Sequence, residues 1–239
     1  MIEGRRYWLV GASEGLGRAL AQALTAAGAS VVLSARSRKR LDELAATLDG
    51  SAVVPVDVTD MTSVRQAAAR IGVVDGVIYN AGSYEPMSAK AWDTSAALAM
   101  NEVNFQGAVR VIGETLPRFL ETGAGDITLI GSLAGYRGLP KAVGYGASKA
   151  ALISLAETMR HDLSGTGVTV RVVNPGFVRT RLTNKNDFKM PMLMEPDQAA
   201  NQIVRSLRSR KFRRDFPAPF SWAMRALNHL PDVVVYRGK

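Results

Sequence analysis

Apolar and polar positions are arranged along the chain in two different patterns. Short runs of consecutive apolar residues, bounded by glycine or polar residues, are typical of strands that are buried on both faces. Longer stretches with an apolar residue every three or four positions are typical of helices packed on one face. We predict strands over residues 6–10, 30–34, 53–56, 76–79, 126–131, 168–173 and 212–216. We predict helices over residues 18–27, 39–48, 62–71, 93–121, 143–163 and 196–209.

The order of these elements predicts the fold class. Strands and helices follow one another in turn, which indicates an α/β fold with a doubly wound parallel sheet and helices on both faces. A length of 239 residues suits one Rossmann-type unit, so we assign residues 1–239 to a single domain. The stretch 93–121 is expected to break near residues 100–104. With no secretion signal, no apolar run near the ~20 residues of a membrane span and no cysteine, we expect a cytoplasmic protein without disulfides.

The segment Tyr145-Gly-Ala-Ser-Lys149 places a phenol and an ammonium four residues apart in the helix predicted over 143–163. That spacing puts both side chains on one helix face, one turn apart. A free phenol has a pKa of about 10, and a nearby positive charge lowers that pKa. We therefore expect Lys149 to lower the pKa of Tyr145 toward the range useful for proton transfer. The alternative is a buried tyrosine whose hydroxyl group is satisfied by the backbone.

A glycine-rich turn joins the first predicted strand to the first predicted helix. Residues 11–17 read Gly-Ala-Ser-Glu-Gly-Leu-Gly, a spacing of G-x-x-x-G-x-G that differs from the commoner G-x-G-x-x-G. Glycines between a strand and a helix let the backbone approach a pyrophosphate, whose charge then lies at the helix N-terminus. The segment therefore predicts a dinucleotide site, and a tight structural turn is the alternative.

From about residue 6 to about residue 205, the chain resembles the short-chain dehydrogenase/reductase family. Besides the glycine-rich turn and the Tyr-Lys pair, further motifs of that family occur in the expected order. They are Asp57, Asn80-Ala81-Gly82, Asn104 in Asn104-Phe-Gln-Gly107, Ser132, and Asn174-Pro175-Gly176. In an open parallel sheet, ligands bind beyond the carboxyl ends of the strands. We therefore expect the residues that follow the predicted strands to converge on one edge of the sheet.

The resemblance implies four catalytic residues, Tyr145, Lys149, Ser132 and Asn104. Tyr145 would exchange a proton with the substrate oxygen, which Ser132 would hold, while the cofactor provides the hydride chemistry. Lys149 would also bind the nicotinamide ribose, and Asn104 would hold a water in a proton relay. The alternatives are that Ser132 only ends a strand and that Asn104 only caps or kinks a helix. Two distant histidines and the absence of cysteine predict no metal site.

Charge after the second predicted strand, together with the resemblance, predicts the cofactor. NAD-dependent enzymes usually place an acid there, whereas here Arg36 follows the strand and the next acid is Asp42. Arg36 can hold the 2′-phosphate of NADP with paired hydrogen bonds, and Ser13 resembles a second phosphate contact. Residues 38–40 are equally consistent with a solvated helix face. We expect NADP(H) to contact Gly11, Ser13, Glu14, Gly15, Leu16, Gly17, Arg36, Asp57, Val58, Asn80, Ala81, Gly82, Tyr145, Lys149, Pro175, Gly176, Val178 and Thr180.

Residues 180–195 resemble the family's mobile flap over the active site. This segment includes Met190, Met192 and Met194, and clustered methionines adapt to irregular apolar shapes. We expect a flap that closes on an apolar ketone, aldehyde or alcohol, and the alternative is that its methionines only pack on the core. The residues expected at the mouth of the site are Tyr84, Tyr136, Leu139 and Phe177.

Residues 210–239 form a basic and apolar extension that departs from the family's usual tetramer-building ending. From residue 205 to residue 239 there are nine basic and two acidic residues, mixed with Phe, Trp, Met and Leu. Such a segment either packs on its own domain with the arginines in water, or makes weak peripheral contact with an anionic membrane. No nucleic-acid module is recognised, so we expect no nucleic-acid binding. We expect a homodimer formed through the two long helices.

These inferences leave two functions open. The first is an NADP(H)-dependent oxidoreductase, of the carbonyl reductase or alcohol dehydrogenase type, that acts on an apolar carbonyl or alcohol. The second is a non-catalytic NADP-binding sensor or scaffold of the same fold. The set Asn104, Ser132, Tyr145 and Lys149 favours the enzyme, because a sensor does not need a phenol tuned for proton transfer.

Overall fold

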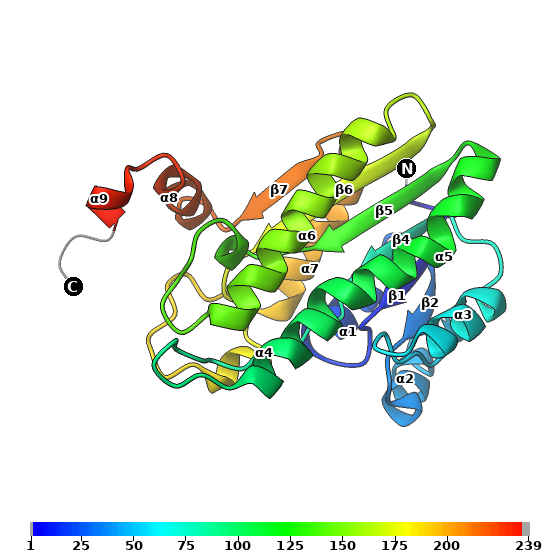
Figure 1. Cartoon of the computed structure of the whole chain (residues 1–239). Coiled ribbons are helices and arrows are strands. Elements are labelled where there is room, and N and C mark those ends of the chain that lie inside the picture. Colours follow the sequence, from blue (N-terminus) through cyan, green and yellow to red (C-terminus); the bar gives the residue numbers. More distant parts are fainter. Residues whose placement is uncertain (1, 236–239) are drawn as a thin grey trace.

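The computed structural model describes residues 2–235, and over these residues seven strands form one sheet (Figure 1). The strands are β1 (Arg6–Val10), β2 (Ser30–Ser34), β3 (Ala52–Val53), β4 (Gly76–Tyr79), β5 (Gly125–Ile130), β6 (Val168–Pro175) and β7 (Arg213–Phe216). They lie in the order β3-β2-β1-β4-β5-β6-β7, and every neighbouring pair is parallel. This arrangement confirms the predicted α/β class.

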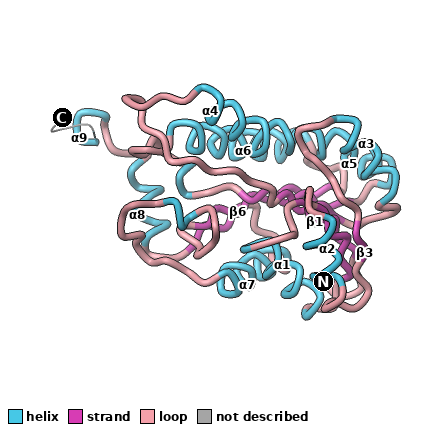
Figure 2. The backbone as a smooth tube through the Cα atoms, turned by 90° about the horizontal axis from the view of Figure 1, so that it is seen from below, coloured by secondary structure: helices cyan, strands magenta, loops and turns pink. Residues whose placement is uncertain are grey.

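Helices cover both faces of the sheet (Figure 2). One layer consists of α1 (Gly15–Ala26), α2 (Arg38–Ala45) and α7 (Pro196–Leu207). The opposite layer consists of α3 (Met61–Arg70), α4 (Thr94–Asn101), α5 (Gly107–Thr122) and α6 (Val143–Asp162). Two short helices, α8 (Phe220–Leu227) and α9 (Asp232–Val235), follow β7 at one end of the molecule (Figure 1). No helix within residues 2–235 has the length and apolar content needed to cross a membrane.

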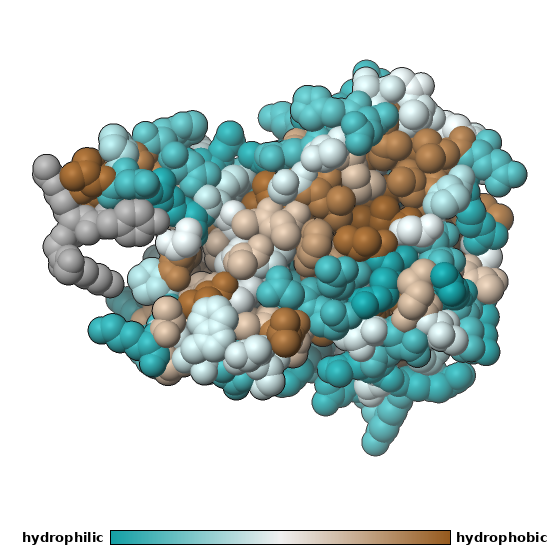
Figure 3. All heavy atoms as spheres, viewed as in Figure 1, coloured by the Kyte–Doolittle hydropathy of each residue, from teal (hydrophilic) through white to brown (hydrophobic). Residues whose placement is uncertain are grey.

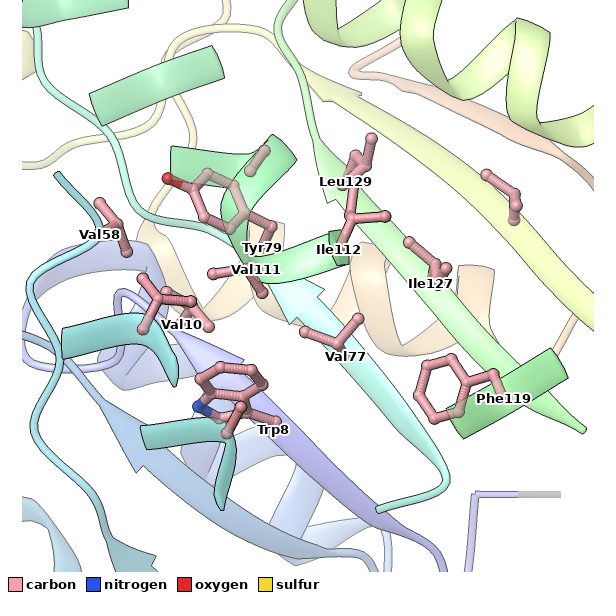
Figure 4. Packing of buried hydrophobic residues seen from close by; sticks show 14 of the residues in the cluster. Trp8, Val10, Val58, Val77, Tyr79, Val111, Ile112, Phe119, Ile127 and Leu129 are labelled. Atoms are coloured by element: carbon pink, nitrogen blue, oxygen red, sulfur yellow. The ribbon is translucent and has the colours of Figure 1, made fainter. Parts of the chain in front are cut away.

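The strands β1, β2, β4 and β5 are buried on both faces, whereas the edge strands β3 and β7 are only partly buried. On one face, Trp8, Val77 and Ile127 pack in a cluster with Val111 and Phe119 of α5 (Figure 4). Burying each side chain of this kind contributes about 1.5–3 kcal/mol to stability. A second cluster between the sheet and the helices α1 and α7 includes Leu9, Leu20, Leu24, Ile78 and Ile203.

Two predicted boundaries differ from the structure. The third strand spans Ala52–Val53 rather than 53–56, although the backbone nitrogens of Val54 and Val56 still donate to the carbonyl oxygens of Leu33 and Ala35. Helix α1 begins at Gly15 rather than at residue 18, so the glycine-rich segment itself forms the first helical turn.

The break expected near residues 100–104 is a π-helical turn. It spans Glu102–Gln106 and joins the end of α4 to the start of α5. Single π-helical turns inside α-helices occur frequently at functional sites. The turn contains the buried Asn104, so it places one of the predicted catalytic residues between α4 and α5.

Candidate active site

The carboxyl ends of the strands meet at one edge of the sheet, where a cleft of about 960 Å³ opens. The strand order reverses between β1 and β4, and ligands of open parallel sheets bind beside such a reversal. Gly11 follows β1, Asn80 follows β4, Ser132 comes shortly after β5, and Pro175 ends β6. All four residues line this cleft.

The cleft brings together the residues that the sequence predicts for the cofactor. It is also lined by three of the four predicted catalytic residues, Ser132, Tyr145 and Lys149. Among the described residues, Asn104 is the predicted site residue that lies outside this lining. The predicted cofactor residues in the lining are Gly11, Ser13, Glu14, Gly15, Leu16, Gly17, Arg36, Asp57, Val58, Asn80, Ala81, Gly82, Tyr145, Lys149, Pro175, Gly176, Val178 and Thr180.

The glycine-rich turn forms a cradle that larger residues would fill. Gly11 has a φ of 91°, and a Cβ atom there would lie 2.5 Å from the backbone nitrogen of Ala81. A Cβ atom at Gly17 would clash with the carbonyl oxygen of Gly11. The Glu14 side chain makes no cap hydrogen bond with α1, and the first turn of α1 contains no acidic residue. The first N–H groups of α1 are therefore suited to a phosphate, and this cradle fits the pyrophosphate of a dinucleotide.

Positive charge surrounds the part of the cleft next to β2. Arg36, Ser37 and Arg40 line it together with Asp57. Burial raises the pKa of the Asp57 carboxyl, but hydrogen bonds from Thr59 and the charge of Arg36 outweigh it and lower that pKa below its usual range. The carboxylate accepts hydrogen bonds from the backbone nitrogen and the hydroxyl group of Thr59, over 3.0 and 2.8 Å. Asp57 is thus ionised and turned toward its own loop.

Tyr145 and Ser132 lie together on the wall of the cleft. Burial raises the pKa of the Tyr145 phenol, a hydrogen bond with Ser132 lowers it, and the neighbouring Tyr84 adds to the increase. The rings of Tyr84 and Tyr145 pack edge to face with their centroids 5.0 Å apart. The net direction is upward, so the expectation that Lys149 lowers the pKa of Tyr145 is wrong for this structure.

The position of the Lys149 ammonium explains that difference. Its Nζ atom donates a hydrogen bond to the carbonyl oxygen of Ile130 over 2.8 Å and lies 5.8 Å from the centroid of the Tyr145 ring. The residue is 4% exposed, and burial lowers the pKa of Lys149 to about 8. Sequence spacing correctly puts both residues on one helix face, but it does not reveal this competing acceptor on β5.

Asn104 holds neighbouring segments together from behind the cleft. Its Oδ1 atom accepts a hydrogen bond from the backbone nitrogen of Ser83 over 2.7 Å. Its Nδ2 atom donates to the carbonyl oxygen of Ser83 over 3.0 Å and to Oγ of Ser148 over 2.9 Å. Oγ of Ser148 in turn donates to the carbonyl oxygen of Tyr145 over 2.8 Å. Asn104 is therefore connected to the helix that carries Tyr145 and Lys149.

Aromatic side chains from three segments form the other half of the cleft. Phe177, which follows β6, stacks on Phe220 of α8 with the ring centroids 5.9 Å apart. It also meets Phe188 of the flap edge to face at 5.7 Å. Leu139 and Met224 complete this apolar surface, which also includes the predicted mouth residue Tyr84.

Of the apolar residues in the flap, Leu182 and Phe188 line the described cleft, whereas Met192 is exposed. Met194 packs against the core, which agrees with the alternative expected for the methionines. The expectation that Tyr136 lines the mouth of the site is wrong. Tyr136 is turned away, because its hydroxyl group donates to the carboxylate of Asp215 over 2.8 Å.

Several cleft residues were not predicted, and their sequence signals differ. Arg40 lies in the first turn of α2, whereas its neighbours Arg38 and Lys39 do not line the cleft, and no sequence motif separates the three. Phe220 and Met224 come from the extension and carry no motif. Ser37, Arg181, Lys185 and Phe188 also line the cleft and were not predicted. Within residues 2–235, no group of three or more His, Cys, Asp or Glu side chains is arranged to hold a metal ion.

Comparison with known proteins agrees with this geometry. Residues 7–190 match the family model of the short chain dehydrogenases. An uncharacterized oxidoreductase of Myxococcus xanthus (strain DK1622) is 35% identical over 241 residues, which cover 96% of this chain and 92% of that protein. The structure of a short-chain dehydrogenase from Streptomyces avermitilis is 28% identical, with a TM-score of 0.84, and the match covers 97% of this chain and 95% of that one.

A second solved structure is that of a short chain dehydrogenase from Burkholderia cenocepacia J2315 in complex with NADP. It is 26% identical, with a TM-score of 0.84, and the match covers 97% of this chain and 100% of that one. The family match extends over more than half of the chain and includes the glycine-rich turn and the Tyr145–Lys149 helix. The chain therefore belongs to the short-chain dehydrogenase family.

Proposed function

We propose that the protein is an NADP(H)-dependent oxidoreductase that interconverts an apolar carbonyl compound and its alcohol, with Tyr145 as the general acid and base. The observation that carries this proposal is one cleft that joins the glycine cradle to Ser132, Tyr145 and Lys149. When NADPH is bound, its nicotinamide supplies a hydride to the carbonyl carbon. The protein then has to orient the carbonyl group and deliver a proton to its oxygen.

The side chains around the carbonyl group divide this work. Tyr145 donates the proton: its phenol is protonated at neutral pH, and the hydrogen bond with Ser132 opposes the rise in pKa that burial causes. The Ser132 hydroxyl group holds the same oxygen through a hydrogen bond. Lys149, with a pKa of about 8, is mainly protonated at neutral pH and can return a proton to the cleft. Asn104 keeps the helix in place through Ser148.

Preference for NADP(H) is supported by the cations near β2. Arg36 and Arg40 line the cleft there, and a guanidinium group can hold a phosphate with two parallel hydrogen bonds. The Asp57 carboxylate nearby is occupied by Thr59. The B. cenocepacia relative was solved with NADP, which agrees with the same cofactor class.

An apolar substrate is supported by the stacked rings of Phe177 and Phe220 and by Phe188 and Met224 beside them. The cations near this end have carboxylate partners. Lys141 pairs with Asp187 over 2.5 Å, and Lys185 pairs with Glu85. A neutral ketone or aldehyde with an apolar group therefore suits this cleft better than an anionic compound.

The decisive experiment compares the wild-type protein with Tyr145→Phe. NADPH oxidation is followed by absorbance with a panel of apolar ketones and aldehydes, and NADPH binding is measured separately. We expect turnover by the wild type and a loss of at least about a hundredfold in the variant, the size of a general acid's contribution, with NADPH still bound. Tight NADPH binding without turnover across the panel would instead support the non-catalytic sensor.

Homodimer formation is proposed for the face covered by α4, α5 and α6. Apolar surface gathers over this face (Figure 3), and Leu98 is 65% exposed there. Val109 and Leu120 of α5 are also exposed large apolar residues. Burying this surface against a second copy would remove it from water. Analytical ultracentrifugation tests the proposal, and a Leu98→Glu variant should shift the protein toward the monomer.

Weak peripheral contact with an anionic membrane is a second proposal for the C-terminal extension. Trp222 on α8 is 68% exposed, and Val233 and Val234 on α9 are also exposed. They lie in the basic stretch 205–239, and apolar side chains among cations suit the surface of anionic lipids. Co-sedimentation with anionic vesicles should be lost in Trp222→Ala, whereas no sedimentation of the wild type would contradict this proposal.

A further inference from the structure

Glu14 places a carboxylate inside the proposed cofactor cleft, between two arginines from different parts of the chain. Its Oε2 atom accepts a hydrogen bond from Nη1 of Arg40, at the start of α2, over 2.8 Å. Its Oε1 atom accepts from Nη2 and Nε of Arg181, at the start of the flap, over 2.5 and 3.1 Å. All three residues line the cleft. Glu14 thus joins the β2 side of the cleft to the flap.

The contacts of Glu14 do not indicate that it is there to stabilise the fold. Glu14 and Asp57 are the two carboxylates among the described residues of the cleft lining, and Asp57 is held by its own loop through Thr59. Glu14 has no such contact and makes no cap bond with α1. Its side chain is 38% exposed, and those of Arg40 and Arg181 are 52% and 66% exposed. Ion pairs that are this exposed contribute little to stability.

The arginines held by Glu14 are the type of group that phosphates bind. Each guanidinium offers several N–H donors in a planar fork that fits a phosphate as well as a carboxylate. Arg40 lies on the same side of the cleft as Arg36, and Arg181 follows Thr180, which a Cβ atom at Gly15 would meet at 3.0 Å. Both arginines are therefore beside the glycine cradle, and a carboxylate there repels a phosphate.

We propose that Glu14 is a counter-ion that Arg40 and Arg181 exchange for the phosphates of the dinucleotide, so that Glu14 limits how tightly the cleft binds NADPH. This inference rests on the proposed function in that it takes NADP(H) as the cofactor. In the free protein, Glu14 keeps both guanidinium groups ordered at the edge of the cradle. On binding, the guanidinium groups turn from the carboxylate to phosphate oxygens. The exposure of both ion pairs allows this exchange at low cost.

The first test is the substitution Glu14→Gln, which keeps the side-chain shape and removes the charge. Dissociation constants for NADPH and NADH are measured by fluorescence titration at several salt concentrations. We expect NADPH to bind about threefold to tenfold more tightly at low salt, as for removal of one charge near a phosphate at a protein surface. The gain should be smaller for NADH, which lacks the 2′-phosphate, and should shrink as salt screens the charges.

The matched control is Glu85→Gln. Glu85 also pairs with a flap cation, Lys185, but it does not line the described cleft. This variant should leave both dissociation constants unchanged, which separates a local charge effect from a general loosening of the flap. An unchanged or weaker affinity of Glu14→Gln for NADPH would overturn the proposal, as would an equal gain in Glu85→Gln.

The second test combines Glu14→Gln with Arg181→Ala. In the wild-type background, Arg181 must leave Glu14 before it binds phosphate, so its removal costs little NADPH affinity. In the Glu14→Gln background the same removal should cost severalfold more, and an equal cost in both backgrounds would overturn the exchange. These readouts measure binding alone. NADPH binding without turnover of any substrate would contradict the proposed function and leave the exchange standing.

Discussion

The side-chain amide of Asn80 donates a hydrogen bond to the backbone carbonyl oxygen of Gly11 over 2.8 Å. The two residues follow β4 and β1, the strands between which the sheet order reverses. A Cβ atom at Gly17 would meet both of them. This bond therefore fixes the glycine cradle to the neighbouring strand at the place where we propose that the pyrophosphate binds.

Asn80→Ala should lower both stability and dinucleotide affinity. Removing the amide leaves the partly enclosed Gly11 carbonyl oxygen without this donor, which costs about 1–2 kcal/mol in the free energy of unfolding. Urea denaturation measures that loss, and fluorescence titration measures the affinity for NADPH. Asn101→Ala is the control, because the Asn101 side chain donates to the carbonyl oxygen of Ala97 within its own helix. Unchanged NADPH affinity in Asn80→Ala would contradict the role of this bond.

Arg36→Ala should weaken NADPH binding about tenfold to a hundredfold and NADH binding much less. The estimate follows from losing a charge-assisted hydrogen bond of about 1.5–3 kcal/mol to the 2′-phosphate. Arg38→Ala is a close control, since Arg38 lies two residues away, pairs with Asp42 at 3.5 Å and is outside the cleft lining. Equal losses for the two cofactors in Arg36→Ala would show that NADP selectivity has another origin.

Phe220→Ala should raise KM for bulky apolar substrates by roughly fivefold to thirtyfold, because about 1–2 kcal/mol of apolar contact is lost. Small ketones that do not reach α8 should be affected much less. Trp222→Ala is the control, because Trp222 is an aromatic residue on the same helix whose side chain is 68% exposed. Steady-state kinetics should therefore show no change for Trp222→Ala. Similar KM values for Phe220→Ala and the wild type would exclude α8 from the substrate site.

The depressed pKa of Lys149 predicts a stability that rises with pH. Burial lowers this pKa from 10.5 in the unfolded chain to about 8 in the folded protein. Between these values the unfolded chain binds more protons than the folded one, so the free energy of unfolding increases with pH across this window. The full change is about 3 kcal/mol, from about 1.36 kcal/mol per pKa unit.

Lys149→Met tests this pH dependence. Denaturant unfolding between pH 8 and pH 10 should show a smaller rise in the variant than in the wild type. Above pH 10, the raised pKa of Tyr145 acts in the opposite direction, because the folded protein then holds a proton that the unfolded chain releases. The comparison is therefore made below that pH. Identical slopes for both proteins would show that Lys149 does not titrate in this range.

The residues of the proposed nucleotide site could be located from the sequence, because they lie in short contiguous motifs after strands. The turn at residues 11–17 and the run Asn80–Gly82 can be recognised from their residue types and spacing alone. The substrate half could not be predicted in the same way. Phe220 reaches the cleft through the pairing of β7 with β6, a long-range contact that leaves no local pattern. One of the two expectations for the extension was that it packs on its own domain. Met224 of α8 is buried and agrees with that expectation.

Burial and competing partners account for the remaining errors. The pKa of Tyr145 depends on how much water the fold excludes, and the Ile130 carbonyl oxygen accepts a hydrogen bond from the Lys149 ammonium. Neither feature follows from a four-residue spacing. The pairing of Glu14 with Arg181 joins residues far apart in sequence. The single-domain assignment, the roles of the site residues and the cytoplasmic location stay predictions.

Helix α8 contributes to the cleft from a part of the chain that is separate from the proposed proton-transfer residues. Tyr145, Lys149 and the glycine cradle all precede Pro175, the last residue of β6, whereas Phe220 and Met224 come after β7. The stretch from residue 217 to residue 235 therefore supplies a wall to the cleft while carrying none of the proposed proton-transfer groups. Grafting this tail from a relative should transplant substrate preference and spare the hydride chemistry, so the two traits can evolve independently.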